Sequence, residues 1–187
     1  MRQYYFTVSS LPYLRLDEAP GLTLDEFHAA CEPWVSPQDL RLIKAADLDP
    51  TVEGPSSPVL DSWRGWERAL RSELVRPRAQ RLGWDPYEHL QTAPFVYGAA
   101  QLAQDALSAD NPLEAEQMLM RARWSFLEEL EVRHAFDVER LVVYSLKLRL
   151  LERRALLDPD GGRERFDSVF DALKGSILKE KITVGEG

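Results

Sequence analysis

The sequence contains little of what disulfide-bonded, thiolate-metal or membrane-spanning proteins need. Cys31 is the single cysteine among 187 residues, which excludes an internal disulfide and a zinc site built from several thiolates. Nowhere do about 18 apolar residues follow one another, so we expect no direct insertion into a membrane. The first residues form an apolar stretch too short and too polar for a signal peptide. Together these features predict a cytoplasmic protein.

Positive charge is also scarce. The 23 Lys and Arg residues stand against 31 Asp and Glu residues, which gives a formal net charge of −8. A charge of this sign repels phosphate backbones and anionic lipid, so we expect no nucleic-acid partner. The hydrophobic fraction of 44% is nevertheless ordinary for a globular chain, and it is too high for a disordered one.

Catalytic motifs are absent as well. The sequence has no Gly-x-x-x-x-Gly-Lys segment for phosphate binding, and its adjacent glycines, Gly161 and Gly162, follow an Asp-Pro-Asp turn. No serine lies in a nucleophile motif, and Cys31 follows two alanines in a way typical of a small buried side chain. We therefore expect neither a catalytic site nor a cofactor.

The chain does contain a series of helix signals, beginning with short ones. Residues 3–11 are apolar and aromatic, and we favour a helix over a strand for them. Thr23-Leu-Asp-Glu26 has capping-box spacing, and Ser36-Pro37 pairs a cap with a proline at the first helical position. A proline-rich run between Asp47 and Pro58 then interrupts regular structure. We predict a small helical N-terminal segment over residues 1–54.

Longer helices follow the proline-rich run. Residues 59–81 place large apolar side chains three and four apart, and they include Pro77, which is expected to bend or shorten the helix. A second helix is predicted to begin at Thr92, with an inner face made of Phe95, Ala99, Leu102, Ala103 and Ala106. Asn111 is expected to cap a third helix that reaches residue 132.

The helix predicted over residues 137–157 is apolar around most of its circumference, as expected for the centre of a core. A final amphipathic helix is predicted near residues 163–178, followed by a flexible tail over residues 179–187. Consecutive helices joined by short loops pack antiparallel. The sequence therefore predicts an all-α fold, with an up-and-down helical bundle over residues 59–178 and a small helical N-terminal part.

One pair of residues suggests metal chemistry. Glu131-Val-Arg-His134 places a carboxylate and an imidazole on one helix face, as in di-iron carboxylate bundles. Such a site needs a second pair, for which Asp25-Glu-Phe-His28 in the N-terminal segment is the one candidate. We therefore favour a solvated helix end for Glu131 and His134. Glu128 and Glu129 are likewise interpreted as part of a charged outer face, and no metal ligand is assigned.

Two groups of residues are candidates for partner binding. Lys147, Arg149, Arg153 and Arg154 gather late in one helix, where cations meet the negative helix end or dock an acidic partner surface. Trp63 and Trp66 share one face of another helix, where they serve as core side chains or as an interface anchor. The sequence leaves both alternatives open.

Two segments resemble a known family. Tyr4-Tyr5-Phe6-Thr-Val8-Ser-Ser10-Leu11-Pro12 resembles the opening of a small uncharacterised bacterial family usually encoded among V/A-type ATPase subunits. Residues 126–137 and 141–153 are similar to that family's second signature. More loosely, this second stretch resembles helices of the connector in the central stalk of the V-type ATPase.

The resemblance implies a non-catalytic accessory or connector-like subunit of a V-type ATPase, with ATPase subunits as partners. Such a subunit acts in the assembly or coupling of ion transport, and it is cytoplasmic or peripheral to the membrane through the complex. Two alternatives stay open from the residues themselves. One is an independent helical adaptor or regulatory protein, and the other is a metal-dependent bundle enzyme built around Glu131 and His134.

Overall fold

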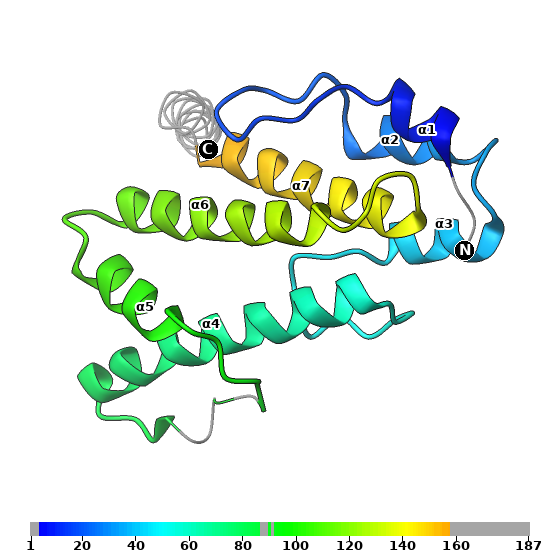
Figure 1. Cartoon of the computed structure of the whole chain (residues 1–187). Helices are drawn as coiled ribbons and strands as arrows, with labels where there is room; N and C mark the ends of the chain where they lie inside the picture. The colour runs from blue at the N-terminus through cyan, green and yellow to red at the C-terminus, as the bar shows by residue number, and fades with distance from the viewer. Residues whose placement is uncertain (1–3, 87–89, 91, 158–187) are drawn as a thin grey trace, which may run out of the picture. The chain divides into compact units, whose positions relative to one another are not determined.

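A computed structural model of the chain describes residues 4–86, 90 and 92–157 (Figure 1). The regular elements in this range are α-helices and no strand is present among them, so the predicted all-α fold is confirmed. The chain divides into two compact units, Met1–Leu151 and Glu152–Gly187. The helices are α1 (Tyr5–Ser10), α2 (Leu24–Cys31), α3 (Pro37–Lys44), α4 (Pro58–Leu82), α5 (Ala99–Ser108), α6 (Pro112–Glu131) and α7 (Val138–Leu156).

Side-chain caps fix where several of these helices begin. At α2 the Thr23 hydroxyl accepts a hydrogen bond from the Glu26 amide at 3.2 Å, and the Glu26 carboxylate accepts one from the Thr23 amide at 2.8 Å. Ser36, Ser57 and Asn111 cap α3, α4 and α6, each with a proline in the first turn. Because these caps satisfy amides that the helix leaves unpaired, the local sequence determines the start points.

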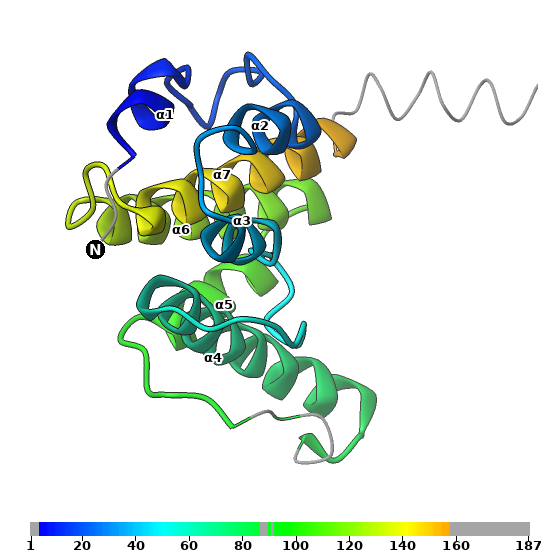
Figure 2. The same ribbon diagram turned by 90° about the vertical axis from the view of Figure 1, so that its right-hand side faces the viewer.

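Helix α7 forms the centre of the core of the first unit, as predicted. The Asp137 carboxylate caps it by accepting a hydrogen bond from the Arg140 amide at 3.1 Å. Its fully buried apolar side chains are Leu141, Val142, Val143, Leu146, Leu148 and Leu150. Because these positions surround the helix, other elements must cover it on all sides. Figures 1 and 2 show α6 running beside it in the opposite direction.

The N-terminal helices supply part of that cover. Residues of α2, α3 and α4 belong to the same apolar cluster as α7, and they include Phe27, Cys31, Ile43, Leu60 and Trp63. The Trp63 indole also donates a hydrogen bond to the Asp47 carbonyl at 3.0 Å. The proline-rich run before α4 therefore connects two parts of one core, and the compact units divide after Leu151.

A smaller apolar cluster joins α4, α5 and α6. Its buried members are Leu70, Leu74, Ala103, Ala106 and Leu119. The small side chains of Ala103 and Ala106, predicted to lie on the inner face of α5, are buried in the cluster. Helix α4 runs through Pro77 and ends at Leu82, where Gly83 adopts the left-handed conformation at φ +69° that favours glycine.

The predicted start of α5 at Thr92 is wrong, because the helix begins at Ala99. Phe95, predicted to lie on the inner helix face, is instead 93% exposed. Two residues account for the difference. The residue before Pro94 is biased toward extended backbone, and Gly98 adopts φ +81°, which no right-handed helix continues through.

The predicted final helix near residues 163–178 and the predicted tail over residues 179–187 lie outside the described residues. The predicted bundle over residues 59–178 is therefore described only as far as residue 157. No helix in the described part of the chain is long and apolar enough to cross a membrane.

Candidate functional site

A pocket in the first unit brings the N-terminal segment and the α6–α7 hairpin together. Its volume is about 100 Å³, and its lining residues are Val8, Leu11, Pro12, Tyr13, Leu14, Glu131, Arg140, Tyr144 and Lys147. Both segments that carry the family resemblance contribute to this lining. Residues far apart in the sequence therefore form a single surface.

Three charged side chains line the pocket, and we call them the Glu131 cluster: Glu131, Arg140 and Lys147. Glu131 bridges the two cations, with Oε1 2.7 Å from Arg140 Nη1 and Oε2 2.6 Å from Lys147 Nζ. The Lys147 ammonium also lies 4.8 Å from the centre of the Trp124 ring, within the range of a cation–π interaction. The cluster carries two positive charges against one negative charge.

The turn between α6 and α7 positions this cluster. Glu131 is the last residue of α6, whereas Arg140 and Lys147 lie on α7. Asp137 holds the turn, because it caps α7 and also lies 2.7 Å from His134 Nδ1 through its Oδ2 atom. The hairpin thus places residues 16 positions apart within hydrogen-bonding distance.

Tyr144 closes the pocket against the N-terminal segment. Its hydroxyl donates a hydrogen bond to the Pro12 carbonyl at 2.9 Å, and its ring packs on Phe27 with centroids 5.0 Å apart. Burial, with a smaller contribution from the nearby Cys31, raises the pKa of the phenol well above its usual range. The hydroxyl therefore stays protonated and acts as a donor that holds the two segments together.

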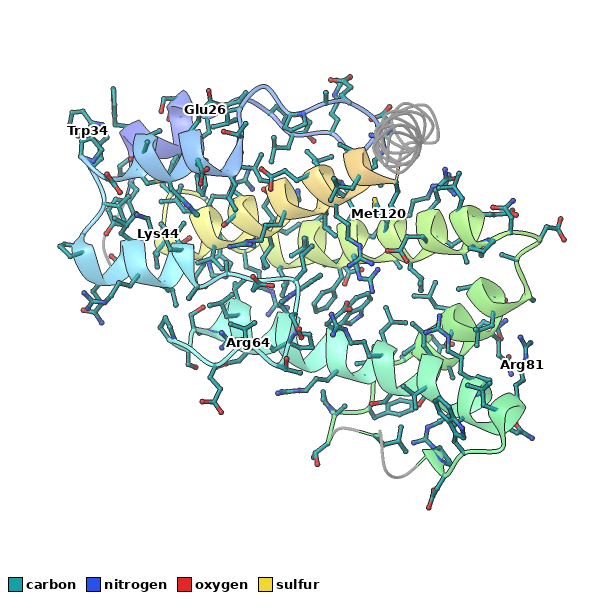
Figure 3. All side chains as sticks on the ribbon, turned by 180° about the vertical axis from the view of Figure 1, so that it is seen from behind. Glu26, Trp34, Lys44, Arg64, Arg81 and Met120 are labelled. Atoms are coloured by element: carbon teal, nitrogen blue, oxygen red, sulfur yellow. The ribbon has the colours of Figure 1, made fainter. Side chains whose placement is uncertain are left out.

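Helix α1, which contributes Val8 to the pocket, also contributes to an exposed aromatic surface. We define the aromatic surface as Tyr5, Phe6 and Trp34, whose side chains are 53%, 63% and 57% exposed. Phe6 and Trp34 pack against each other with ring centroids 4.6 Å apart, and Tyr5 packs on Phe136 at 4.5 Å. Figure 3 shows Trp34 projecting from the connection between α2 and α3.

A second charged group, the Glu67 cluster, is built around a buried carboxylate and consists of Glu67, Arg71 and Arg123. The Glu67 carboxylate is 1% exposed and accepts two hydrogen bonds from Arg123, at 2.9 and 3.0 Å, and one from Arg71, at 3.0 Å. Burial alone lowers the pKa of Arg123, but hydrogen bonding to Glu67 and the charges of Glu67 and Glu116 outweigh it, so the pKa is raised. This cluster joins α4 to α6, with Glu67 and Arg123 buried and Arg71 39% exposed at its edge.

The comparisons with known proteins bear on the same part of the chain. A protein-family model described as "Protein of unknown function (DUF2764)" matches residues 101–177, which is less than half of the chain. This range includes α6, α7 and the segment with the second family-like signature. No curated protein and no solved structure matches the chain.

The two tryptophans proposed from the sequence as an interface anchor occupy different environments. Trp63 is fully buried in the core and exposes no surface to a partner. Trp66 is half-buried, and its ring stacks on Phe126 with centroids 4.8 Å apart. Both side chains therefore pack within the first unit.

The four cations proposed as a docking group are also separated. Lys147 is buried against Glu131, and Arg149 lies 3.2 Å from Asp47 through Nη1 and Oδ2. Arg153 and Arg154 are exposed in the last turn of α7, in the second compact unit. A role for Arg153 and Arg154 in partner binding stays a prediction.

The metal-binding alternative gains no support from the geometry. Glu131 is directed to Arg140 and Lys147, while His134 pairs with Asp137, so the two predicted ligands have separate partners. Across residues 4–86, 90 and 92–157, no group of three His, Cys, Asp or Glu side chains is arranged to hold a metal ion. Glu131 also departs from the solvated helix end expected for it, because its side chain is 15% exposed.

Sequence reasoning missed Arg140 and Tyr144 as pocket residues and Phe6 with Trp34 as a surface pair. A weak signal was present for the first two, since Tyr144 lies in the family-like segment and Arg140 just before it. Placing them opposite Glu131 and Pro12 requires the hairpin and the fold of the N-terminal segment. Large exposed aromatics carry no sequence signal that separates them from core residues.

Proposed function

We propose that this protein is a non-catalytic accessory or connector-like subunit of a V-type ATPase, acting through protein–protein contacts in the assembly or coupling of ion transport. The partners in this proposal are ATPase subunits. The proposal places the protein in the cytoplasm, peripheral to the membrane through the ATPase complex.

One observation supports the proposal most directly. The two segments that resemble a family encoded among V/A-type ATPase subunits are far apart in sequence but pack together. The Tyr4 amide donates a hydrogen bond to the Phe136 carbonyl at 2.5 Å, and Tyr144 donates one to the Pro12 carbonyl. Since both segments line one pocket, and Phe136 of the second packs on Tyr5 of the aromatic surface, a shared binding role explains why they occur together.

The exposed side chains favour a protein partner. Exposed tryptophan, tyrosine and phenylalanine are typical of interface centres, where they bury much area at little entropic cost. Tyr5, Phe6 and Trp34 are held in place by ring contacts, so little further ordering is needed on binding. This surface is where we expect an ATPase protein to bind.

Affinity capture of the tagged full chain from its native cells, in mild detergent, tests the proposal. We expect V-type ATPase subunits among the captured proteins, and we expect the double variant F6S/W34S to lose them. The matched control is F95S/Y97S, which removes two aromatics that are 93% and 94% exposed elsewhere in the fold. Failure of the wild-type chain to capture any part of the ATPase contradicts the proposal.

A further inference from the structure

We infer that the pocket at the Glu131 cluster binds a carboxylate side chain, Asp or Glu, presented by a partner protein. The inference deepens the proposed protein–protein function and rests on it only for the identity of the partner. It rests on the charge of the pocket lining, on the hydrogen-bond donors of its cations and on the size of the pocket.

The charge of the pocket lining is complementary to that of a carboxylate. Among the nine lining residues, the charged ones are Glu131, Arg140 and Lys147, so the lining carries one net positive charge. The whole chain, by contrast, has a net charge of −8. A partly enclosed site strengthens attraction to an anion, because water screens it less than at an open surface.

Arg140 and Lys147 have more N–H donors than Glu131 can accept from. A guanidinium has five N–H donors and an ammonium has three. Glu131 is the acceptor that the structure gives to both side chains, through Arg140 Nη1 and Lys147 Nζ. Arg140 lines the pocket and is 29% exposed, so solvent or an incoming group can reach its guanidinium. A second carboxylate oxygen would satisfy them with charge-assisted hydrogen bonds.

The size of the pocket selects a side chain over a larger ligand. A volume of about 100 Å³ is well below the roughly 300–1,000 Å³ of typical small-molecule sites. The apolar lining residues Val8, Leu11 and Leu14 suit the methylene groups of Glu or the Cβ of Asp. Val8 shares α1 with Tyr5 and Phe6, so a polypeptide lying on the aromatic surface can insert one acidic residue into the pocket.

Two blocked amino acids provide a direct test with the full chain. N-acetyl-glutamate amide and N-acetyl-glutamine amide differ only in the carboxylate, and each is titrated while amide resonances are followed by NMR. We expect saturable shifts at Leu11, Leu14 and Arg140 with the glutamate probe, and binding of the glutamine probe that is weaker by about tenfold or more. Equal shifts with both probes, or shifts spread over other surface cations, overturn the inference.

Variants sharpen the test. R140Q should weaken the glutamate probe about tenfold, whereas R133Q, which removes an exposed arginine from the α6–α7 turn, should leave binding unchanged. E131Q should strengthen binding, because it removes the internal competitor for both cations. Unchanged binding in R140Q contradicts the inference. If R140Q does not fold, the comparison of the two probes on the wild-type chain decides.

The native capture experiment separates this inference from the proposed function. Loss of the captured ATPase subunits in R140Q supports both. Probe binding by a chain that captures no part of the ATPase contradicts the proposed function and leaves the carboxylate site standing. If the chain captures ATPase subunits but the purified chain does not bind the glutamate probe, the proposed function stands and the carboxylate site is contradicted.

Discussion

The two charged clusters use the same arrangement, one carboxylate bridging two cations, in different surroundings. Glu67 is 1% exposed and binds Arg123 through two parallel hydrogen bonds. Glu131 is 15% exposed and binds each of its cations through one oxygen, at the edge of a pocket. We call the Glu67 cluster closed because its carboxylate is buried, although Arg71 at its edge is 39% exposed. We call the Glu131 cluster open because all three of its side chains line a pocket.

The charge balance also differs between them. Around Glu67, the second partner of Arg71 is Asp49, and Glu116 lies 3.7 Å from Arg123, so acids outnumber cations. Around Glu131, cations outnumber the acid. We therefore expect the Glu67 cluster, whose cations have further acidic partners, to hold helices together, whereas the proposed ligand site is at the Glu131 cluster.

The largest expected effect is at the closed cluster. E67Q removes the anion that compensates the buried Arg123, so we expect the free energy of unfolding to fall by about 3–5 kcal/mol. Urea denaturation measures this loss. The matched control on the same helix is E73Q, whose pair with Arg76 is more exposed and should cost less than about 0.5 kcal/mol. If E67Q and E73Q lose the same free energy of unfolding, the proposed difference between the buried and the exposed ion pair is contradicted.

A smaller effect is expected at Lys147, the buried cation of the open cluster. K147M keeps the packing against Trp124 but removes one partner of Glu131, which retains Arg140. We expect a loss of about 1–3 kcal/mol in the free energy of unfolding, measured by urea denaturation. K44M is the control, because the Lys44–Glu32 pair is exposed and should contribute little. A loss as large as that of E67Q contradicts our account of the open cluster.

Arg140 should contribute still less to stability. Its side chain is 29% exposed, and solvent screens its pair with Glu131, so R140Q should cost less than about 1 kcal/mol. A double-mutant cycle of Glu131 and Arg140, compared with one of Glu67 and Arg123, measures the contrast. The contrast between the clusters fails if the two coupling energies are equal.

The smallest effect concerns pH and the edge of the Glu67 cluster. Hydrogen bonds from Thr51, followed by the charge of Arg71, lower the pKa of Asp49 below 3.8. A lowered pKa stabilises the fold above the unfolded value, and this contribution is lost as the pH falls through the folded value. We therefore expect D49N to be less stable than wild type at pH 6 by under about 0.5 kcal/mol.

Thermal unfolding from pH 6 to pH 2 checks this dependence. The difference between D49N and wild type should shrink as the pH falls below 3.8. E53Q, in the same connection between α3 and α4, is the control for a general loss of negative charge. A difference for D49N that stays constant with pH contradicts the proposed role of its carboxylate.

Much of the local structure could be predicted from the sequence. The caps at Thr23, Ser36 and Asn111 depend on residues three positions apart, and all three are observed. The burial of α7 could be predicted because apolar residues surround it. The prediction at Phe95 failed because a periodic apolar pattern continued across Pro94 and Gly98, whose backbone preferences prevailed.

The candidate site was harder to predict. Lys147 was grouped with the cations late in the helix but lies in the middle of α7, and its partner Glu131 lies across the α6–α7 turn. Glu67 and Arg123 are separated by 56 positions, and no local pattern connects them. Trp63 and Trp34 are the same residue type, yet one is fully buried and the other is 57% exposed. Composition and periodicity do not contain these distinctions.

The sequence by itself determined the all-α class, the beginnings of the capped helices and the central position of α7. These features depend on contacts within one or two helical turns and on the distribution of apolar side chains around a helix axis. Only the tertiary structure decided which charged side chains are buried against their partners and which line a pocket. That outcome depends on burial and on distances between residues far apart in the chain, which arise only when the helices pack.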